Sequence, residues 1–453
     1  MAGKGFSHIP TKVKFVKTKY RSIKTSLPVP ESLPLLKKMY DLESRSMHGQ
    51  YPMIWDKAES FQVHDRWGNT WIDFTSTIFV ANAGHSNERV LNRIRNLIDK
   101  PLLHTYTYPS QERIDYLEYL IERTPPNFEK AFLLSAGTEA TEAALKLMRL
   151  NAKKTGKKGG IISFHGAYHG RTLGAQTMTG SESARDWIGY QDPNIFYLPF
   201  PYPWAYEDPK EFFNETIEDL LEKYEINPKT DLCGFILESF QGWGAIFYPN
   251  EYIAELFAFA KKYNILTAFD EMQAGFGRTG ELFGYEHYGV TPDLICCGKG
   301  ASSGLPLSLV LGSKNIMDIP DIGSMSSTHS ANPLVCAAGH ATLEALYEDN
   351  LIKNSFFLGK VLHIELSKLK KKFSGYIKYV NGKGLIAAII FQDDNNTPLV
   401  ELCNSICEKA FQRGLLLVHT GRESIKIAPP LNITEEALIE GIEVIEECIK
   451  DSI

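Results

Sequence analysis

The sequence predicts an α/β protein whose larger domain is a mostly parallel sheet covered by helices on both faces. Between about residue 110 and residue 300, short apolar runs alternate with helical patterns, the order that a parallel sheet with crossover helices requires. The chain has 453 residues, enough for two or three domains. Its composition, 43% hydrophobic and 23% charged, is that of a globular protein in water.

Residues 1–85 are expected to form an N-terminal arm and a segment of a small subdomain. The first thirty residues carry seven basic side chains and no acid. No apolar signal-peptide core accompanies them, and most are Lys rather than Arg, so we interpret them as an arm rather than a targeting segment. A short helix is expected within 31–50. Apolar positions alternate on both sides of Trp67-Gly68-Asn69, which predicts a β-hairpin over 61–74.

Residues 86–333 are expected to form the large domain and residues 334–453 a smaller α+β domain. In the large domain, helices are predicted near 88–97, 110–123, 139–150, 210–224 and 251–263, strands at 131–134, 160–164, 232–237, 265–269 and 293–297, and a long loop at 193–206. In the smaller domain, helices are predicted at 333–348, 355–370 and after the N-cap Thr434, and strands at 384–391 and 415–418.

Polar or glycine-containing segments follow five of the predicted strands. They are Ser135 to Thr138, His165 to Gly170, Glu238, Asp270 and Lys299. Ligands of such sheets bind at the carboxyl ends of the strands, so these segments are expected to meet in one crevice.

The stretch from Ile265 to Leu309 carries the most specific chemistry. Asp270 ends one apolar run, and Lys299 follows the next between two glycines. A lysine in this position suits a Schiff base with an aldehyde cofactor, and the acid suits a protonated ring nitrogen of that cofactor. Each residue also has an ordinary interpretation: a solvated lysine, and an aspartate in a salt bridge, for example to Arg278.

Three further residues fit the same cofactor. Gly137 and Thr138 open a helix, whose free amides and dipole suit a phosphate, although an ordinary N-cap explains them equally well. Tyr168 lies in a glycine-flanked turn and could stack on a planar ring, or it could be a core tyrosine. The neighbouring His169 is more often a structural histidine than a ligand.

Several classes of function are not supported. A net charge of -6 gives no electrostatic footprint for nucleic acid. No apolar run approaches the roughly 18 residues of a membrane span. Seven scattered cysteines indicate reduced thiols and a cytoplasmic location. Cys403 and Cys407, one helical turn apart, have no nearby His or Cys pair, so no metal site is expected.

Five segments together resemble the class III aminotransferases. They are Ser-Ala-Gly-Thr-Glu-Ala, Phe-His-Gly-Ala-Tyr-His-Gly-Arg-Thr, Phe-Asp-Glu-Met-Gln-Ala-Gly-Phe-Gly-Arg-Thr-Gly, Gly-Lys-Gly and Thr-His-Ser-Ala-Asn-Pro-Leu. The resemblance runs in order from about Pro52 to Pro429-Pro430-Leu431. It implies fold type I, with a seven-stranded sheet in the large domain, pyridoxal 5'-phosphate as cofactor, and a homodimer whose active sites are shared across the interface.

The resemblance also implies roles for single residues. Lys299 would form the internal aldimine and move the proton, and Asp270 would hold the pyridine nitrogen protonated. The remaining cofactor contacts would be Gly137 and Thr138 at the phosphate, Tyr168 on the ring face, Gln273 at the 3' oxygen, Glu238 as a supporting strand-end acid, and Thr328 at the phosphate of the neighbouring subunit. The implied reaction is a ping-pong transfer of an amino group from an amine or ω-amino acid to a 2-oxo acid.

Departures from the family pattern concern the substrate. Relatives often carry Glu-Pro where this chain has Glu238-Ser239. The acid and arginine that many relatives use to handle glutamate are replaced here by Trp243 and Lys426. We therefore expect a bulky or apolar substrate arm against Trp243, and Arg422 or Lys426 as the group that receives a carboxylate. For Arg422 the ordinary alternative is a surface charge paired with Glu423.

Two alternatives to transamination stay open at this point. Aminomutases, decarboxylases and phospho-lyases resemble the same family, because the cofactor supplies the electron sink and the protein selects the bond that breaks. A subunit that kept the fold only for binding is the second alternative, and the complete set of cofactor residues argues against it.

Overall fold

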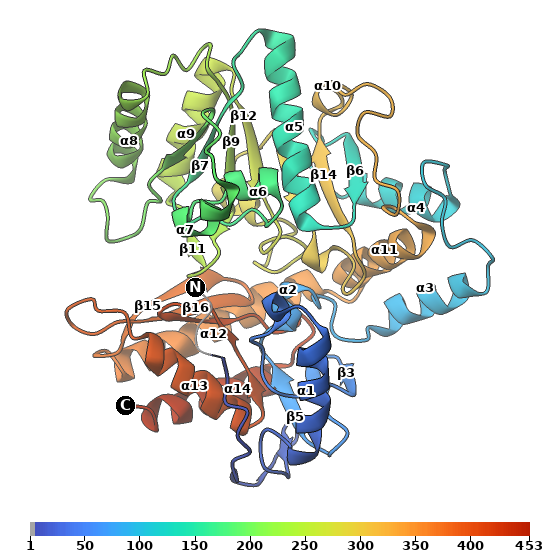
Figure 1. The fold of residues 1–453 in the computed structure, drawn as a ribbon, viewed down its shortest axis with the longest axis vertical. Coiled ribbons are helices and arrows are strands. Elements are labelled where there is room, and N and C mark those ends of the chain that lie inside the picture. The colour runs from blue at the N-terminus through green and yellow to red at the C-terminus, as the bar shows by residue number, and fades with distance from the viewer. Residues whose placement is uncertain (1–4) are drawn as a thin grey trace.

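The computed structural model describes residues 5–453. In Figure 1 the protein has an upper and a lower lobe, and a seven-stranded sheet lies at the centre of the upper lobe. The strand order is β6-β14-β13-β12-β9-β7-β8. Only β14 runs antiparallel to its neighbours. The strands are β6 (Lys130–Leu134), β7 (Gly160–Phe164), β8 (Ile195–Leu198), β9 (Leu232–Glu238), β12 (Leu266–Asp270), β13 (Leu294–Cys297) and β14 (Ser308–Gly312). The predicted mostly parallel seven-stranded sheet is confirmed.

Long amphipathic helices cover this sheet. α5 begins directly after β6 and packs against β9, β13 and β14 through buried alanines and leucines, including Ala140, Ala144 and Leu147. It ends at Gly156, whose φ of 76° is a left-handed conformation that glycine adopts without strain. The upper-lobe helices are α3 (Glu88–Ile98), α4 (Gln111–Ile121), α5 (Gly137–Thr155), α6 (Leu173–Thr177), α7 (Glu182–Arg185), α8 (Pro209–Lys223), α9 (Asn250–Tyr263) and α10 (Lys314–Met317).

One prediction for this lobe is wrong. Residues 193–206 were expected to form a loop throughout, but Ile195–Leu198 is the edge strand β8, parallel to β7. The ends of this short run, Ile195 and Leu198, are buried, and the Pro- and Tyr-rich sequence begins only after it. The strand β14 was also not predicted. It carries the chain back along the sheet between β13 and β6.

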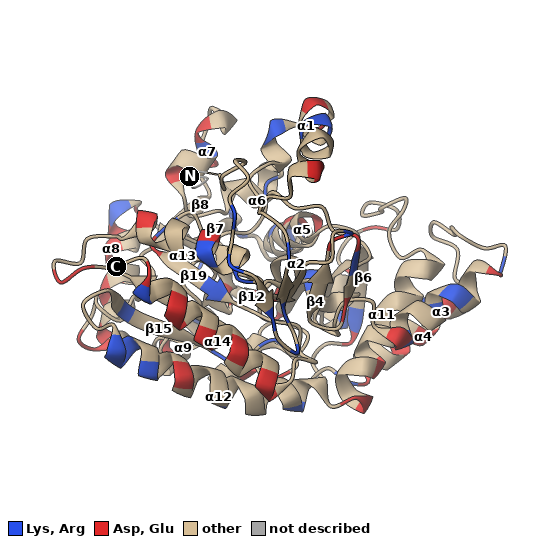
Figure 2. Cartoon of the chain, turned by 90° about the horizontal axis from the view of Figure 1, so that it is seen from below, with Lys and Arg blue, Asp and Glu red and all other residues tan. Residues whose placement is uncertain are grey.

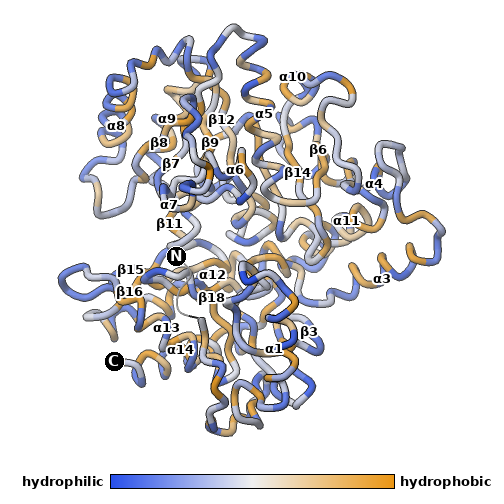
Figure 3. The backbone as a smooth tube through the Cα atoms, in the orientation of Figure 1, coloured by the Kyte–Doolittle hydropathy of each residue, from blue (hydrophilic) through white to orange (hydrophobic). Residues whose placement is uncertain are grey.

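The lower lobe contains two smaller sheets and the helices that follow residue 350, whereas the helix Pro333–Glu348 packs against α3 and α4 (Figure 1). One sheet has the order β15-β16-β19-β18, and the other joins N-terminal strands to β17. The C-terminal elements are α11 (Pro333–Glu348), α12 (Leu351–Lys372), β15 (Ile377–Lys383), β16 (Ile386–Phe391), α13 (Val400–Gln412), β17 (Leu415–Leu416), β18 (Val418–His419), β19 (Ser424–Ile427) and α14 (Glu435–Lys450). Figure 3 shows the hydrophobic segments concentrated in the strands and inner helix faces of both lobes.

The N-terminal segment is fastened to the C-terminal helix. Lys19 and Arg21 form ion pairs with Glu436 and Glu440 of α14, at 2.7 and 2.6 Å. The predicted hairpin over 61–74 is present as β4 and β5. The N-terminal elements are β1 (Val16–Lys17), β2 (Ser22–Ile23), α1 (Leu33–Leu42), β3 (Lys57–Glu59), β4 (Gln62–His64), β5 (Thr70–Asp73) and α2 (Ser76–Phe79).

Charged side chains of both signs are intermixed over the helices that Figure 2 shows from below. Within residues 5–453, no helix is both long and apolar enough to cross a bilayer. In the interior, the fully buried Arg278 joins the two lobes. It donates hydrogen bonds to the carbonyls of Leu385 and Pro429, to Ser76 Oγ and to Asn82 Oδ1.

Candidate active site

A cavity of about 290 Å³ lies at the carboxyl edge of the central sheet. Its walls come from the segments that follow β6, β7, β9, β12 and β13, so all five polar strand ends meet there as expected. The site residues that line it are Gly137, Thr138, Tyr168, Glu238, Asp270, Gln273 and Lys299. A short antiparallel pair of strands, β10 (Phe240–Gln241) and β11 (Ile246–Phe247), follows Glu238 and closes one side of the cavity.

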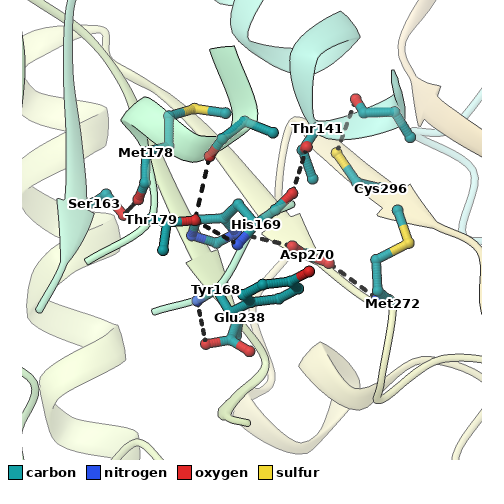
Figure 4. A network of polar contacts seen from close by, with 12 residues as sticks. Thr141, Ser163, Tyr168, His169, Met178, Thr179, Glu238, Asp270, Met272 and Cys296 are labelled. Carbon is teal, nitrogen blue, oxygen red and sulfur yellow. Dashed lines mark hydrogen bonds and ion pairs between the residues drawn. The ribbon is translucent and has the colours of Figure 1, made fainter. Parts of the chain in front are cut away.

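Asp270 is held in place by two donors (Figure 4). Its Oδ2 lies 2.8 Å from His169 Nδ1, and its Oδ1 accepts a hydrogen bond of 3.0 Å from the amide of Met272. The carboxylate is only 4% exposed, so it needs such partners. The ordinary alternative, a salt bridge to a nearby base, has His169 as the partner of Asp270 and not Arg278, whose guanidinium donates to groups of the lower lobe and the N-terminal region.

Lys299 enters the cavity from the neighbouring strand end. It follows β13, which pairs in parallel with β12, and its φ of 40° is unusual for a residue with a side chain. Such strain is found where surrounding structure fixes a functional residue. Burial lowers the pKa of Lys299, and the charges of Asp270 and Glu238 oppose this. A lowered pKa makes more of the amine available as a nucleophile.

The first turn of α5 forms another wall. The amides at a helix N-terminus have no partner within the helix, so those of Gly137 and Thr138 can bind an anion. A Cβ at Gly137 would lie 2.7 Å from Met272 Sδ, so a larger residue here would displace the Met272 side chain, which also lines the cavity. Thr138 Oγ1 lies 2.6 Å from Thr172 Oγ1.

Tyr168, Glu238 and Gln273 form a connected group in the same cavity. The Tyr168 amide donates to Glu238 Oε2 at 3.2 Å, and Gln273 Nε2 lies 3.4 Å from Glu238 Oε1. The Tyr168 side chain is 43% exposed, which leaves a face free for a planar ligand. Burial raises the pKa of Glu238 to about 7.

The expected substrate residues lie beyond the cavity wall. The guanidinium of Arg422 stacks on the ring of Trp243, 3.8 Å from its centroid, and pairs with Glu423 at 3.1 Å. Lys426 is buried, and its ammonium donates to Gln273 Oε1 at 3.0 Å. Thr328 is exposed on a loop outside the cavity, where its carbonyl oxygen lies 2.6 Å from His104 Nε2.

Sequence reasoning missed the pairing of His169 with Asp270. The preference for a structural histidine agrees with the burial of His169, which is 2% exposed, but its direct contact with the buried acid was not predicted. Its position in the turn after β7, one residue beyond Tyr168, was the available signal. The contact from Lys426 to Gln273 was also missed, since no spacing rule joins residues so far apart.

These residues fit pyridoxal 5'-phosphate. The cavity offers helix amides for a phosphate at Gly137, an exposed aromatic face at Tyr168, and a buried carboxylate at Asp270. The Nε2 atom of His169 is buried without a hydrogen-bond partner among residues 5–453. Within these residues, the His169 ring therefore has its hydrogen bond to Asp270 alone. Lys299 supplies the amine that an aldehyde cofactor requires.

A lysine and a paired acid at adjacent strand ends of this sheet define a pyridoxal-phosphate enzyme of fold type I. The sequence model described as aminotransferase class-III matches residues 44–449, and the chain belongs to this family. It is a pyridoxal-phosphate-dependent aminotransferase.

The chain is 33% identical to an alanine/serine racemase of Pyrococcus horikoshii, over 99% of this chain and 96% of that protein. It is 31% identical to a 4-aminobutyrate aminotransferase of Mycobacterium leprae, over 95% and 98%. Among solved structures, an (S)-enantioselective ω-transaminase of Thermomicrobium roseum has a TM-score of 0.84 and 27% identity, over 93% and 98%.

Proposed function

We propose that the enzyme moves an amino group from an amine or ω-amino acid to a 2-oxo acid, with Lys299 as the group that moves the proton. The observation that carries this proposal is the convergence of Lys299 and Asp270 on one cavity from adjacent parallel strands. The bound cofactor supplies the electron sink. The chain supplies the amine at Lys299, and the carboxylate at Asp270 that keeps the ring nitrogen protonated.

The other cofactor contacts are proposed from their places on the cavity wall. Gly137 and Thr138 would hold the phosphate with first-turn amides, and Tyr168 would pack on the ring. Gln273 would donate to the 3' oxygen, and Glu238 would support Gln273 through their 3.4 Å contact.

Arg422, rather than Lys426, is the proposed receptor for a substrate carboxylate. The Arg422 side chain is 47% exposed and lies flat on Trp243, whereas Lys426 is 6% exposed and already donates to Gln273. A planar guanidinium also binds a carboxylate through two parallel hydrogen bonds. The ring of Trp243 then forms the platform beside which a bulky substrate arm lies.

Kinetics of three variants test this assignment. Arg422→Gln should raise KM for 2-oxo acids by at least about tenfold, the value of one lost charged hydrogen bond. Uncharged amine donors should keep their KM. Glu423→Gln frees Arg422 from its ion pair and should lower KM for the same acids. The exposed Arg95→Gln is the control. Equal kinetics of Arg422→Gln and wild type for every 2-oxo acid would refute the assignment.

The reaction type has a separate test. With an amine donor and no acceptor, an aminotransferase converts its cofactor stoichiometrically to the amino form, which absorbs at shorter wavelength. Lys299→Ala should lose both the visible band of the lysine-linked cofactor and multiple turnover. Retained turnover in Lys299→Ala would overturn the proposal.

Racemisation is the second candidate, because a relative that aligns over almost the whole chain is named an alanine/serine racemase. A racemase returns the proton to the substrate carbon and leaves the cofactor aldehyde intact. Incubation with L-alanine or L-serine in D₂O therefore separates the two reactions. Loss of optical activity with solvent deuterium in the product and no amino form of the cofactor would favour the racemase.

A homodimer is proposed on the basis of an exposed apolar region around Thr328. Leu103, Tyr108 and Ile322 are 60%, 75% and 107% exposed, and His104 connects their segments through its contact with Thr328. Exposed large apolar side chains on two segments that meet at this contact favour a protein interface there. Thr328 would then reach the phosphate bound by the partner. Mixing Lys299→Ala with Thr328→Ala should restore some activity if the sites are shared.

The proposed domain organisation is an N-terminal part over 1–85, a cofactor domain over 86–333 and a C-terminal part over 334–453. The proposed location is the cytoplasm, because the seven cysteines are buried free thiols. Fractionation of the native cells, with the enzyme recovered outside the cytoplasmic fraction, would contradict the location.

A further inference from the structure

Lys426 is a buried cation to which the proposed reaction assigns no role. It lies on β19 in the lower lobe, where it pairs with Ala388 of β16 and Val418 of β18. Its side chain nevertheless reaches the upper lobe, because its Nζ donates to Gln273 Oε1 at 3.0 Å. The ammonium also lies 4.3 Å from the ring centroid of Phe79. A single hydrogen bond thus joins the lower lobe to a residue of the cofactor cavity.

The donor character of Lys426 fixes the orientation of the Gln273 amide. An ammonium group can only donate, so the atom of Gln273 that faces it must be the carbonyl oxygen. The amide nitrogen must therefore point the other way, towards Glu238 Oε1 at 3.4 Å. Gly242 packs behind this amide, since a Cβ there would lie 2.3 Å from Gln273 Nε2. Gly242 therefore limits the room on that side of the amide.

We infer that Lys426 is a positioning residue that holds the carbonyl oxygen of Gln273, so that the amide nitrogen, with one N–H facing Glu238, keeps its second N–H for the 3' oxygen of the cofactor and so sets the acidity of the lysine-linked cofactor. The inference rests on the proposed role of Gln273. It assigns to Lys426 a task other than binding a substrate carboxylate.

The charges around Lys426 support this role. The pKa of Lys426 is lowered to about 7, chiefly by burial; the charge of Glu238 opposes this shift and that of Lys299 adds to it. The ammonium is thus stabilised by its hydrogen bond to the Gln273 oxygen and by the charge of Glu238. A neutral amine can accept a hydrogen bond as well as donate one. Deprotonation of Lys426 would therefore release the constraint on Gln273.

Spectral titration of the holoenzyme without substrates tests the inference. The visible absorbance of the lysine-linked cofactor reports its protonation. In Lys426→Met, the loss of a cation and of an oriented donor near the 3' oxygen should raise the apparent pKa of this transition by about one unit. Lys426→Arg keeps both features and should titrate close to wild type. Lys383→Met, a half-buried lysine of the same sheet over Phe247, is the control and should leave the transition unchanged.

A double-mutant cycle shows whether Lys426 acts through Gln273. If it does, Gln273→Ala and Lys426→Met should each shift the transition, and the double variant should shift it by less than their sum. Additive shifts, or a Lys426→Met titration that coincides with wild type, would overturn the inference. A raised KM for 2-oxo acids with an unchanged titration would return Lys426 to the role of carboxylate receptor. If Lys426→Met does not fold, Lys426→Gln should shift the transition in the same direction.

Different results would contradict the proposed function and the proposed role of Lys426. If Lys299→Ala keeps the visible band, the proposed function is wrong. If Lys299→Ala loses the band while every Lys426 variant titrates like wild type, only the role of Lys426 is wrong.

Discussion

Replacing Asp270 with Asn should remove most of the catalytic power and leave the fold intact. The asparagine side chain has the shape of the carboxylate and keeps one of the two oxygens that now accept from His169 and from the Met272 amide, at 2.8 and 3.0 Å. What the change removes is a negative charge beside the ring nitrogen. At a hydrogen-bond distance of about 3 Å and an effective dielectric constant of about 20, that charge contributes about 5.5 kcal/mol. This corresponds to about four pKa units of the ring nitrogen.

The expected single-turnover rate of Asp270→Asn is lower than that of wild type by about 10² to 10⁴-fold. Each increase of about 1.36 kcal/mol in the activation barrier slows the reaction tenfold, and only part of the lost charge stabilisation raises the barrier. The assay mixes holoenzyme with an amine donor and no acceptor, and follows the visible absorbance of the bound cofactor. Asp293→Asn is the matched control, because Asp293 accepts from the Thr267 amide at 2.8 Å at the opposite edge of the same sheet. An Asp270→Asn rate within tenfold of wild type would refute the reasoning.

Three further changes test other parts of the site and the core. Gly137→Ala should weaken cofactor binding at least about tenfold, because its Cβ would lie 2.7 Å from Met272 Sδ. The control Gly375→Ala has open space around it and should bind the cofactor like wild type. Equilibrium dialysis measures cofactor binding by both variants. Burial raises the pKa of Glu271 to about 7, above an unfolded value of about 4.3, so the free energy of unfolding should fall as pH rises between these values. Glu271→Gln should flatten that decline in urea titrations. Arg278→Met leaves several buried acceptors without a donor and should cost about 3 kcal/mol or more of unfolding free energy, and a loss below about 1 kcal/mol would contradict this.

The upper sheet could be predicted because its strands are local signals. Runs of four to seven apolar residues followed by a glycine or a polar group identify β6, β7, β9, β12 and β13 without any tertiary information. The same rule fails for β8, because this strand leads into a Pro- and Tyr-rich segment and not into a glycine or a polar group. The ends of the central strands also point to the site, since parallel strands bring their carboxyl ends to one edge.

The partners of the charged groups could not be predicted in this way. Arg278 follows Asp270 closely in sequence, which suggested a salt bridge between them. Its guanidinium instead donates to backbone carbonyls of the lower lobe. His169 and Asp270 are 101 residues apart, and Gln273 and Lys426 are 153 apart. The first pairing depends on how the ends of β7 and β12 meet in the upper sheet and the second on how the two lobes meet, and no local spacing rule encodes either.

The lobe contacts imply that the site is less stable than the sheet that carries it. The Gln273 amide depends on Lys426 from the lower lobe, and a buried charge that loses its partner costs several kcal/mol. The site is therefore complete only while β19 and the loop after β12 stay together, whereas the central sheet is held by its own ladders and by α5. We expect the visible band of the cofactor to be lost at a lower urea concentration than the far-ultraviolet circular dichroism of the helices, because local opening precedes global unfolding. Lys426→Met should widen the gap between the two transitions, and Lys383→Met should not. Coincident transitions in wild type and in Lys426→Met would show that the two lobes open as one unit.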